Sequence, residues 1–209
     1  MGSIILQALL SVTYPIQASA VALAMSFIAL SIDGYRWKTG QTRFWPKVVD
    51  LSLFLLWAFL TLSIFTALPE FDPVSKFFKL WGGFINTTVL AVISFVSCLV
   101  VKGGWCYQVA VDKQTDPKVT SSDGFKSVCK DISLLWGGLF ILMAAGNALN
   151  VATNMSLDED YNLQHDSDTI NYTLGVGWGI IVVFAGKRAT KVLVLKRKNA
   201  IKERAAMGG

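Results

Sequence analysis

Charged residues are scarce in this sequence. Only 16% of its 209 residues are Asp, Glu, Lys or Arg, whereas soluble domains carry roughly 25%. The hydrophobic share is 53% and the mean hydropathy is +0.50. Because so little polar sequence remains outside the apolar runs, we expect residues 1–209 to form a single membrane domain, without a separate soluble domain.

Histidine and cysteine are also rare, and this excludes most metal and haem chemistry. A lone histidine, His165, cannot supply both axial ligands of a membrane cytochrome. The three cysteines, Cys98, Cys106 and Cys129, have neither the spacing of zinc ligands nor a CxxC pair. We therefore expect no metal, no cofactor and no disulfide framework.

The usual catalytic motifs are missing. The chain contains no GxSxG, no HExxH and no phosphate-cradling glycine loop, so no catalytic residue is predicted. The net charge of +5 does not indicate a nucleic-acid partner, because the bases flank apolar segments and there serve membrane orientation. No charge falls in the centre of an apolar run, which argues against a proton-coupled transporter.

What the sequence does contain is long uncharged runs. Each approaches or exceeds the roughly 18 residues that cross a bilayer. The five runs are 1–32, 51–69, 80–101, 132–157 and 169–186. They predict an all-α bundle, an integral membrane protein with five transmembrane helices at about 13–32, 48–69, 78–101, 132–153 and 171–190. Residues 1–12 are expected to form a short interfacial segment.

The charges between these runs predict orientation, because basic residues are retained on the cytoplasmic side of a membrane. Segment 34–47 has four bases and no acid, segment 154–168 has five acids and no base, and residues 187–209 have eight bases and one acid. We therefore predict an outside N-terminus and a cytoplasmic C-terminus. Residues 102–131 then form a cytoplasmic loop, and 191–209 form a basic cytoplasmic tail.

Asparagines occur at one predicted depth. Asn86 lies about six residues into the third helix, and Asn147 and Asn150 lie at a similar distance from the outer end of the fourth. Together with Thr87 they predict a polar cluster in the outer half of the membrane. Such a cluster is either an interhelical clamp or the lining of a small polar pocket.

Two further sets of residues have expected roles. Asp33 closes the first helix and Asp50 opens the second, both at the cytoplasmic interface, where neighbouring bases predict ion pairs. Those bases are Arg36, Lys38 and Lys47. Glycines in the third, fourth and fifth helices are expected to allow close helix packing. They are Gly82, Gly83, Gly137, Gly138, Gly175 and Gly179.

An ordered series of features runs through the middle of the chain. A turn with acids and lysines, EFDPVSKFFKLW, leads into a helix that ends at Lys102; Phe125 follows a polar loop, and Trp136 precedes Asn147 by eleven residues. In these features the stretch from Glu70 to Ala152 resembles the intracellular septation protein A family of small five-helix bacterial inner-membrane proteins. The resemblance implies a multi-pass protein of the bacterial inner membrane, linked to envelope maintenance or division through other membrane proteins.

Three functions are compatible with these observations. The first is a non-enzymatic membrane protein that acts through contacts with other membrane proteins or with itself, using 102–131 as a contact surface. The second is a small-solute or ion channel or carrier with the level of Asn86, Asn147 and Asn150 as its constriction. The third is a membrane enzyme on a lipid or isoprenoid substrate, with Asp33 and Asp50 as candidate acids. The expected partners are the lipid bilayer and other membrane proteins.

Overall fold

The computed structural model describes residues 15–66, 71–114, 116–154, 156–157, 163–164 and 168–207, and nearly all of them are helical. The helices are α2 (Pro15–Lys38), α3 (Val48–Thr66), α4 (Phe71–Val100), α5 (Gly104–Lys113), α6 (Pro117–Ser121), α7 (Asp123–Asn154) and α8 (Asp168–Met207). Two short strands, β1 (Ser156–Leu157) and β2 (Leu163–Gln164), pair antiparallel between α7 and α8. The all-α prediction is confirmed.

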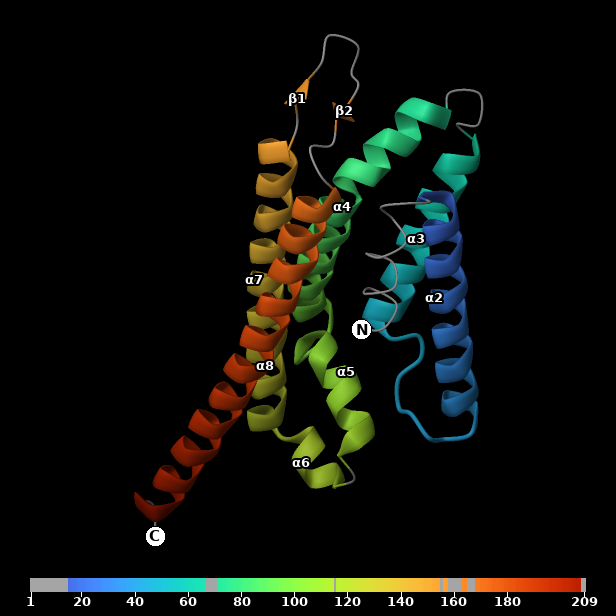
Figure 1. Cartoon of the computed structure of the whole chain (residues 1–209). Coiled ribbons are helices and arrows are strands. Elements are labelled where there is room, and N and C mark those ends of the chain that lie inside the picture. The colour runs from blue at the N-terminus through green and yellow to red at the C-terminus, as the bar shows by residue number, and fades with distance from the viewer. Residues whose placement is uncertain are drawn as a thin grey trace.

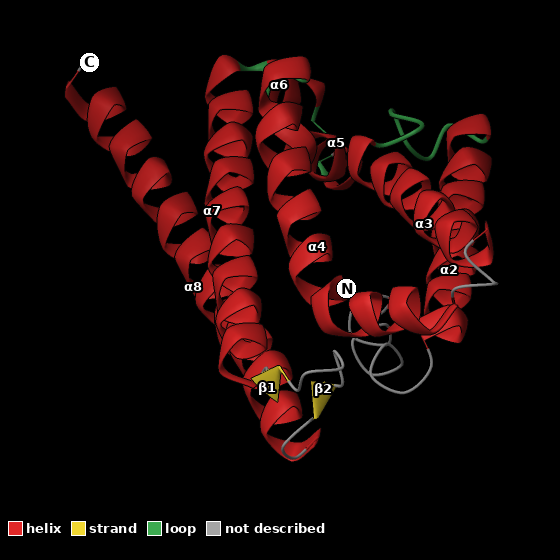
Figure 2. Cartoon of the chain, turned by 90° about the horizontal axis from the view of Figure 1, so that it is seen from above, coloured by secondary structure: helices red, strands yellow, loops and turns green. Residues whose placement is uncertain are grey.

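The long helices form two groups (Figure 1). Helix α4 packs along α7, α8 packs on the other side of α7, and α2 pairs with α3. Helix α4 begins near the end of α3 and crosses over to α7, so it links the two groups (Figure 2). The short helices α5 and α6 lie at the end of the bundle opposite β1 and β2, which we call the α6 end. Helix α8 extends beyond the other helices at this end.

Local sequence explains where several helices begin and end. Pro15 and Pro117 occupy the first positions of α2 and α6, where the missing N–H of proline costs nothing. Asp116 caps α6 by accepting a hydrogen bond from the backbone N–H of Lys118 at 2.9 Å. Gly103 separates α4 from α5 with a φ of +100°, a conformation that favours glycine.

Four helices are longer than the apolar runs predicted. Helix α2 continues to Lys38, α4 begins at Phe71, α7 begins at Asp123 and α8 continues to Met207. The predicted helices stopped at charged residues, but Lys, Arg and Glu are good helix formers and keep the turns beyond an apolar run helical. For the same reason the predicted loop 102–131 contains α5, α6 and the first turns of α7. The predicted interfacial segment 1–12 lies outside the described residues.

Two helical stretches, Trp81–Val100 and Asp123–Leu149, are long and apolar enough to cross a membrane, and α3 contains the shorter apolar stretch Val48–Ser63. The most apolar windows of the first two are only 39% and 28% buried, unlike the core helix of a soluble protein. Large apolar side chains are exposed on the long helices; Leu99 of α4 is 86% exposed and Phe59 of α3 is 67% exposed. A surface of this kind favours a membrane location.

Candidate functional site

The predicted polar cluster falls on the contact between α4 and α7. Asn147 donates from Nδ2 to Thr87 Oγ1 at 3.5 Å, and Thr87 donates to the backbone oxygen of Gly83 at 2.8 Å. Gly83 makes room for this contact, because a Cβ there would lie 3.3 Å from Asn147 Nδ2. An interhelical hydrogen bond inside a membrane contributes about 0.6 kcal/mol on average. The pair therefore acts as a weak clamp between α4 and α7.

Asn86 is buried in α4 beside Thr87, yet no described group hydrogen-bonds with its Oδ1. The hydroxyl of Thr88 is also buried and unpaired in the described part of the chain. The side chain of Asn150 lies outside the described residues. Of the four residues predicted to form the cluster, the structure therefore joins Thr87 with Asn147, and it leaves the Oδ1 of Asn86 without a partner among the described groups.

Buried hydroxyl groups continue along α4 and α7 toward the α6 end, beyond the polar cluster that the sequence predicted. Ser94 donates to the backbone oxygen of Leu90, and Ser97 donates to that of Ser94, each at 2.8 Å. Ser133 of α7 donates to the backbone oxygen of Cys129 at 3.0 Å. Because each hydroxyl bonds within its own helix, these small residues allow close packing and offer no free polar path between α4 and α7.

The glycines predicted to pack helices differ in how closely a neighbouring helix approaches them. Gly137 faces Phe95 of α4, where an added Cβ would lie 3.0 Å from the ring, and Gly83 faces Asn147 as described above. Gly179 is looser, with Met143 at 3.6 Å from such a Cβ, and Gly82 and Gly138 have nothing within 4 Å. The surroundings of Gly175 lie outside the described side chains.

Two glycines that sequence reasoning missed make the tightest contacts between α7 and α8. A Cβ on Gly186 of α8 would lie 2.6 Å from Leu139 of α7, and a Cβ on Gly146 of α7 would overlap the indole of Trp178. Neither has a GxxxG partner in register, so the usual packing motif did not reveal it.

At the α6 end, Lys47 joins two acids from different parts of the chain. Its Nζ lies 2.7 Å from Asp33 Oδ2 and 3.2 Å from Asp112 Oδ2, and its side chain is 12% exposed. Burial lowers the pKa of Lys47, but hydrogen bonds with Asp33 and Asp112 outweigh it and raise the pKa above its usual 10.5. The carboxyl group of Asp50 is in hydrogen-bonding contact with that of Asp33. The two interfacial acids therefore converge, and Lys47 is the base that pairs with Asp33.

Asp112, which sequence reasoning missed, ties α5 to the segment between α2 and α3. It accepts hydrogen bonds from Thr42 Oγ1 at 3.0 Å and from the backbone N–H of Arg43 at 3.1 Å. Gln108, one turn earlier in α5, accepts from the backbone N–H of Val48 at 2.9 Å. Part of the predicted contact surface 102–131 therefore packs against the chain's own segment between α2 and α3. Among the described side chains, no set of three or more His, Cys, Asp or Glu is arranged to hold a metal ion.

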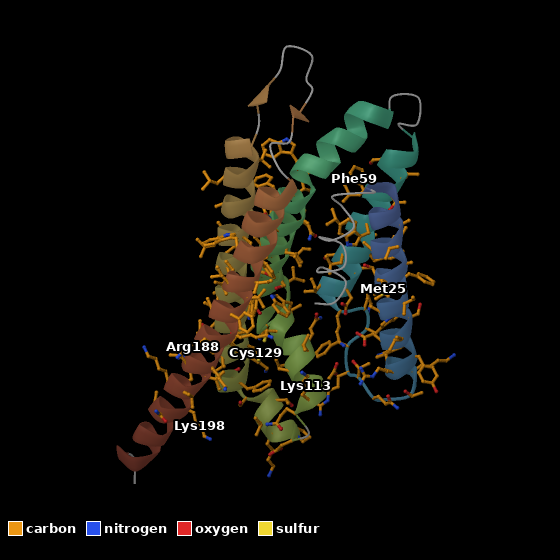
Figure 3. The ribbon with its side chains drawn as sticks, viewed as in Figure 1. Met25, Phe59, Lys113, Cys129, Arg188 and Lys198 are labelled. Carbon is orange, nitrogen blue, oxygen red and sulfur yellow. The ribbon has the colours of Figure 1, made fainter. Side chains whose placement is uncertain are left out.

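An apolar groove of about 370 Å³ runs between α2 and α3. One hydroxyl group lines it, that of Thr61, which is 8% exposed and hydrogen-bonds to no described group. Phe59, which Figure 3 labels on the same helix, is not one of the lining residues. The other lining residues are Ala20, Leu23, Ala24, Phe27, Phe54 and Ala58. The groove is therefore apolar and open, and Thr61 carries the one unsatisfied polar group among its described lining residues.

Comparisons of the chain with protein-family models, with curated proteins and with solved structures find no match.

Proposed function

We propose that this protein is a non-enzymatic, multi-pass membrane protein that binds a helix of another membrane protein in the groove between α2 and α3. The observation that carries the proposal is the hydroxyl of Thr61, which is buried in an apolar groove without a hydrogen-bond partner. A buried hydroxyl that lacks a partner is costly, by about 1–3 kcal/mol. A ligand that supplies an acceptor removes this cost.

The chemistry of the groove favours a helix as its occupant over a lipid chain. Three of the lining residues, Ala20, Ala24 and Ala58, are small, and small residues let two helix backbones approach closely in a membrane. A partner helix offers backbone carbonyl and side-chain oxygen atoms to the hydroxyl of Thr61, whereas an acyl chain offers no acceptor. We therefore take a transmembrane helix as the occupant.

Five membrane crossings form part of the proposal. The lengths of α2, α3, α4, α7 and α8 support them, since each has 19 residues or more, close to the roughly 20 that a crossing needs. The base-rich segment 34–47 and the base-rich tail support a cytoplasmic α6 end. The resemblance to septation protein A extends the proposal to envelope maintenance or division in a bacterial inner membrane.

Photocrosslinking in the native membrane tests the groove. Benzoylphenylalanine replaces Phe54, which lines the groove, and in a matched variant it replaces Phe59, which is exposed on the same helix. We expect the Phe54 position to give a defined protein adduct and the Phe59 position to give lipid adducts. Ala58→Leu should abolish the protein adduct by filling the groove.

The hydroxyl of Thr61 is tested separately in the same assay. Thr61→Val should weaken the adduct by about fivefold or more, because valine gains nothing when a partner helix supplies an acceptor, whereas the hydroxyl then sheds a cost of about 1–3 kcal/mol. Thr61→Ser should preserve the adduct. Lipid adducts alone at both positions would refute the proposal. If adducts form only between copies of this chain, the occupant of the groove is a helix of a second copy and not of another protein.

A channel or carrier is the second candidate, and one observation favours it. The Oδ1 of Asn86 is buried without a described partner, as a group that meets a passing solute would be. The hydroxyl groups of Ser94, Ser97 and Ser133 count against it, because each is already bonded within its own helix. A polar path across the membrane would therefore have to continue from Asn86 past three serine hydroxyl groups that are already bonded.

A further inference from the structure

The three cysteines, distant in sequence, meet where α4, α5 and α7 join. Cys98 lies near the end of α4, Cys106 lies in the first turn of α5, and Cys129 lies in α7. Cys106 and Cys129 share a side-chain hydrogen bond, and all three thiols are free. Figure 3 labels Cys129 at this junction. Sequence spacing alone concealed the pair, because 22 residues, including the whole of α6, separate its members.

Two glycines and a serine allow α4, α5 and α7 to approach closely at this junction. Gly103 and Gly104 have φ values of +100° and +67°, and a Cβ on Gly104 would lie 2.5 Å from Ser133 Oγ and 2.9 Å from Cys98 Sγ. The backbone N–H of Cys106 donates to Ser133 Oγ at 3.1 Å, and Ser133 in turn donates to the backbone oxygen of Cys129 at 3.0 Å. One serine therefore places Cys106 next to the turn of α7 that carries Cys129.

The two thiols of the pair have different environments. The hydrogen bond with Cys129 lowers the pKa of the Cys106 thiol, although burial opposes the shift. Cys106 is the third residue of α5, and the partial positive charge at a helix N-terminus also favours a thiolate. Cys129 is 3% exposed, while Cys106 is partly exposed. A small oxidant therefore reaches Cys106 first.

We propose that Cys106 and Cys129 are a redox-active thiol pair that a peroxide closes into a reversible disulfide between α5 and α7. The Cys106 thiolate attacks one oxygen of hydrogen peroxide, the O–O bond breaks, and the sulfur becomes a sulfenic acid as hydroxide leaves and takes up a proton to form water. The sulfur of Cys129 then attacks the sulfenic sulfur and releases its thiol proton. The S–O bond breaks and a second water leaves. In total two thiols lose two electrons and peroxide gains them.

The disulfide has a structural consequence for the α6 end. Helix α5 also carries Gln108 and Asp112, which hold the segment between α2 and α3. A covalent link between α5 and α7 therefore joins the α2–α3 pair more firmly to α7. Oxidation of the pair would therefore affect the α2–α3 pair that forms the groove. The disulfide itself forms whether or not the groove is occupied.

Peptide mapping of the full-length protein in native membranes tests the pair directly. The chain is treated with hydrogen peroxide, free thiols are alkylated, and the protein is digested with trypsin. The three cysteines fall in three different tryptic peptides, 80–102, 103–113 and 127–130. We expect a linked 103–113/127–130 peptide, a loss of alkylation from both members, and recovery of both after dithiothreitol.

Three variants complete the test. Cys129→Ser should let dimedone trap a sulfenic acid on Cys106, with labelling several-fold above wild type, and Cys106→Ser should abolish that labelling. Cys98→Ser is the matched control and should leave the linked peptide unchanged. Full alkylation of the 103–113 peptide in peroxide-treated wild type refutes the proposal, and so does a link that joins Cys98 instead. Because the peptide mapping uses the wild-type protein, its result does not depend on whether the cysteine variants fold.

Discussion

Trp178 of α8 donates its indole hydrogen to the backbone oxygen of Leu142 in α7 at 3.0 Å. The indole lies against Gly146, one turn further along α7, so closely that a Cβ there would overlap the ring. A glycine thus leaves the backbone of α7 open to a polar contact from the neighbouring helix. Together with the ion pair between Arg197 of α8 and Asp131 of α7, the contact helps to determine how α8 is rotated on α7.

Gly146→Ala should destabilise the protein by about 1–3 kcal/mol, the usual cost of overpacking a tight contact. Unfolding in mixed micelles with increasing SDS, followed by circular dichroism, measures the change. Gly138→Ala, on the same helix with open space around it, is the control and should be neutral or stabilising by up to about 1 kcal/mol. Equal effects of the two variants would contradict the proposed contact.

Lys47→Met should destabilise the protein by about 2–3 kcal/mol, because Asp33 and Asp112 then face each other without their shared cation. The value lies below the 3–5 kcal/mol of a fully buried pair because these groups retain some exposure. Lys113→Met, at an exposed position of α5, should change stability by less than about 0.5 kcal/mol. The same SDS titration measures both, and a Lys47 variant as stable as the Lys113 variant would argue against the ion pairs.

The stability difference between wild type and Lys47→Met should stay constant between about pH 7 and 9. The folded-state pKa of Lys47 is raised above 10.5. Its contribution is therefore complete below the unfolded-state pKa and is lost only as the pH rises through the higher folded-state value. Unfolding curves at both pH values check this, and a difference that shrinks by pH 9 would show that Lys47 loses its proton earlier.

Asn147→Leu should leave the permeability of proteoliposomes to ions and small solutes unchanged, and should cost at most about 1 kcal/mol of stability. The reason is that, among the described residues, its amide makes only a long hydrogen bond of 3.5 Å, to Thr87. Flux assays with potassium and glycerol provide the measurement, and Thr87→Val serves as a second variant from the same contact. A changed flux in both would favour the channel over the partner-binding protein.

Lys113→Cys and Lys198→Cys should both react with a membrane-impermeant maleimide only after intact cells are opened. Two helices, α7 and α8, separate these positions, and two crossings return the chain to the same side. Wild type, whose cysteines are buried or partly buried, gives the background labelling. Labelling of only one position in intact cells would rule out the proposed five-span arrangement.

The helices could largely be predicted from the sequence, since an uncharged run of bilayer length permits little other than a helix. Their ends could not, because helix formation continues through charged turns such as those at the end of α8. Depth alone predicted that Asn147 lies at the level of Thr87, but not that these two side chains pair. The roles of Gly146 and Gly186 were not predicted either, because a glycine's contact depends on the rotation of the opposing helix.

By itself, the sequence determined the helical class of this protein and the apolar surface that favours a membrane, because both follow from local composition and run length. Only the tertiary structure decided that Lys47 pairs with Asp112 and that Cys106 meets Cys129. Each pair joins separate elements of the chain. Such contacts depend on how whole helices cross and rotate, and no local pattern of residues encodes that geometry.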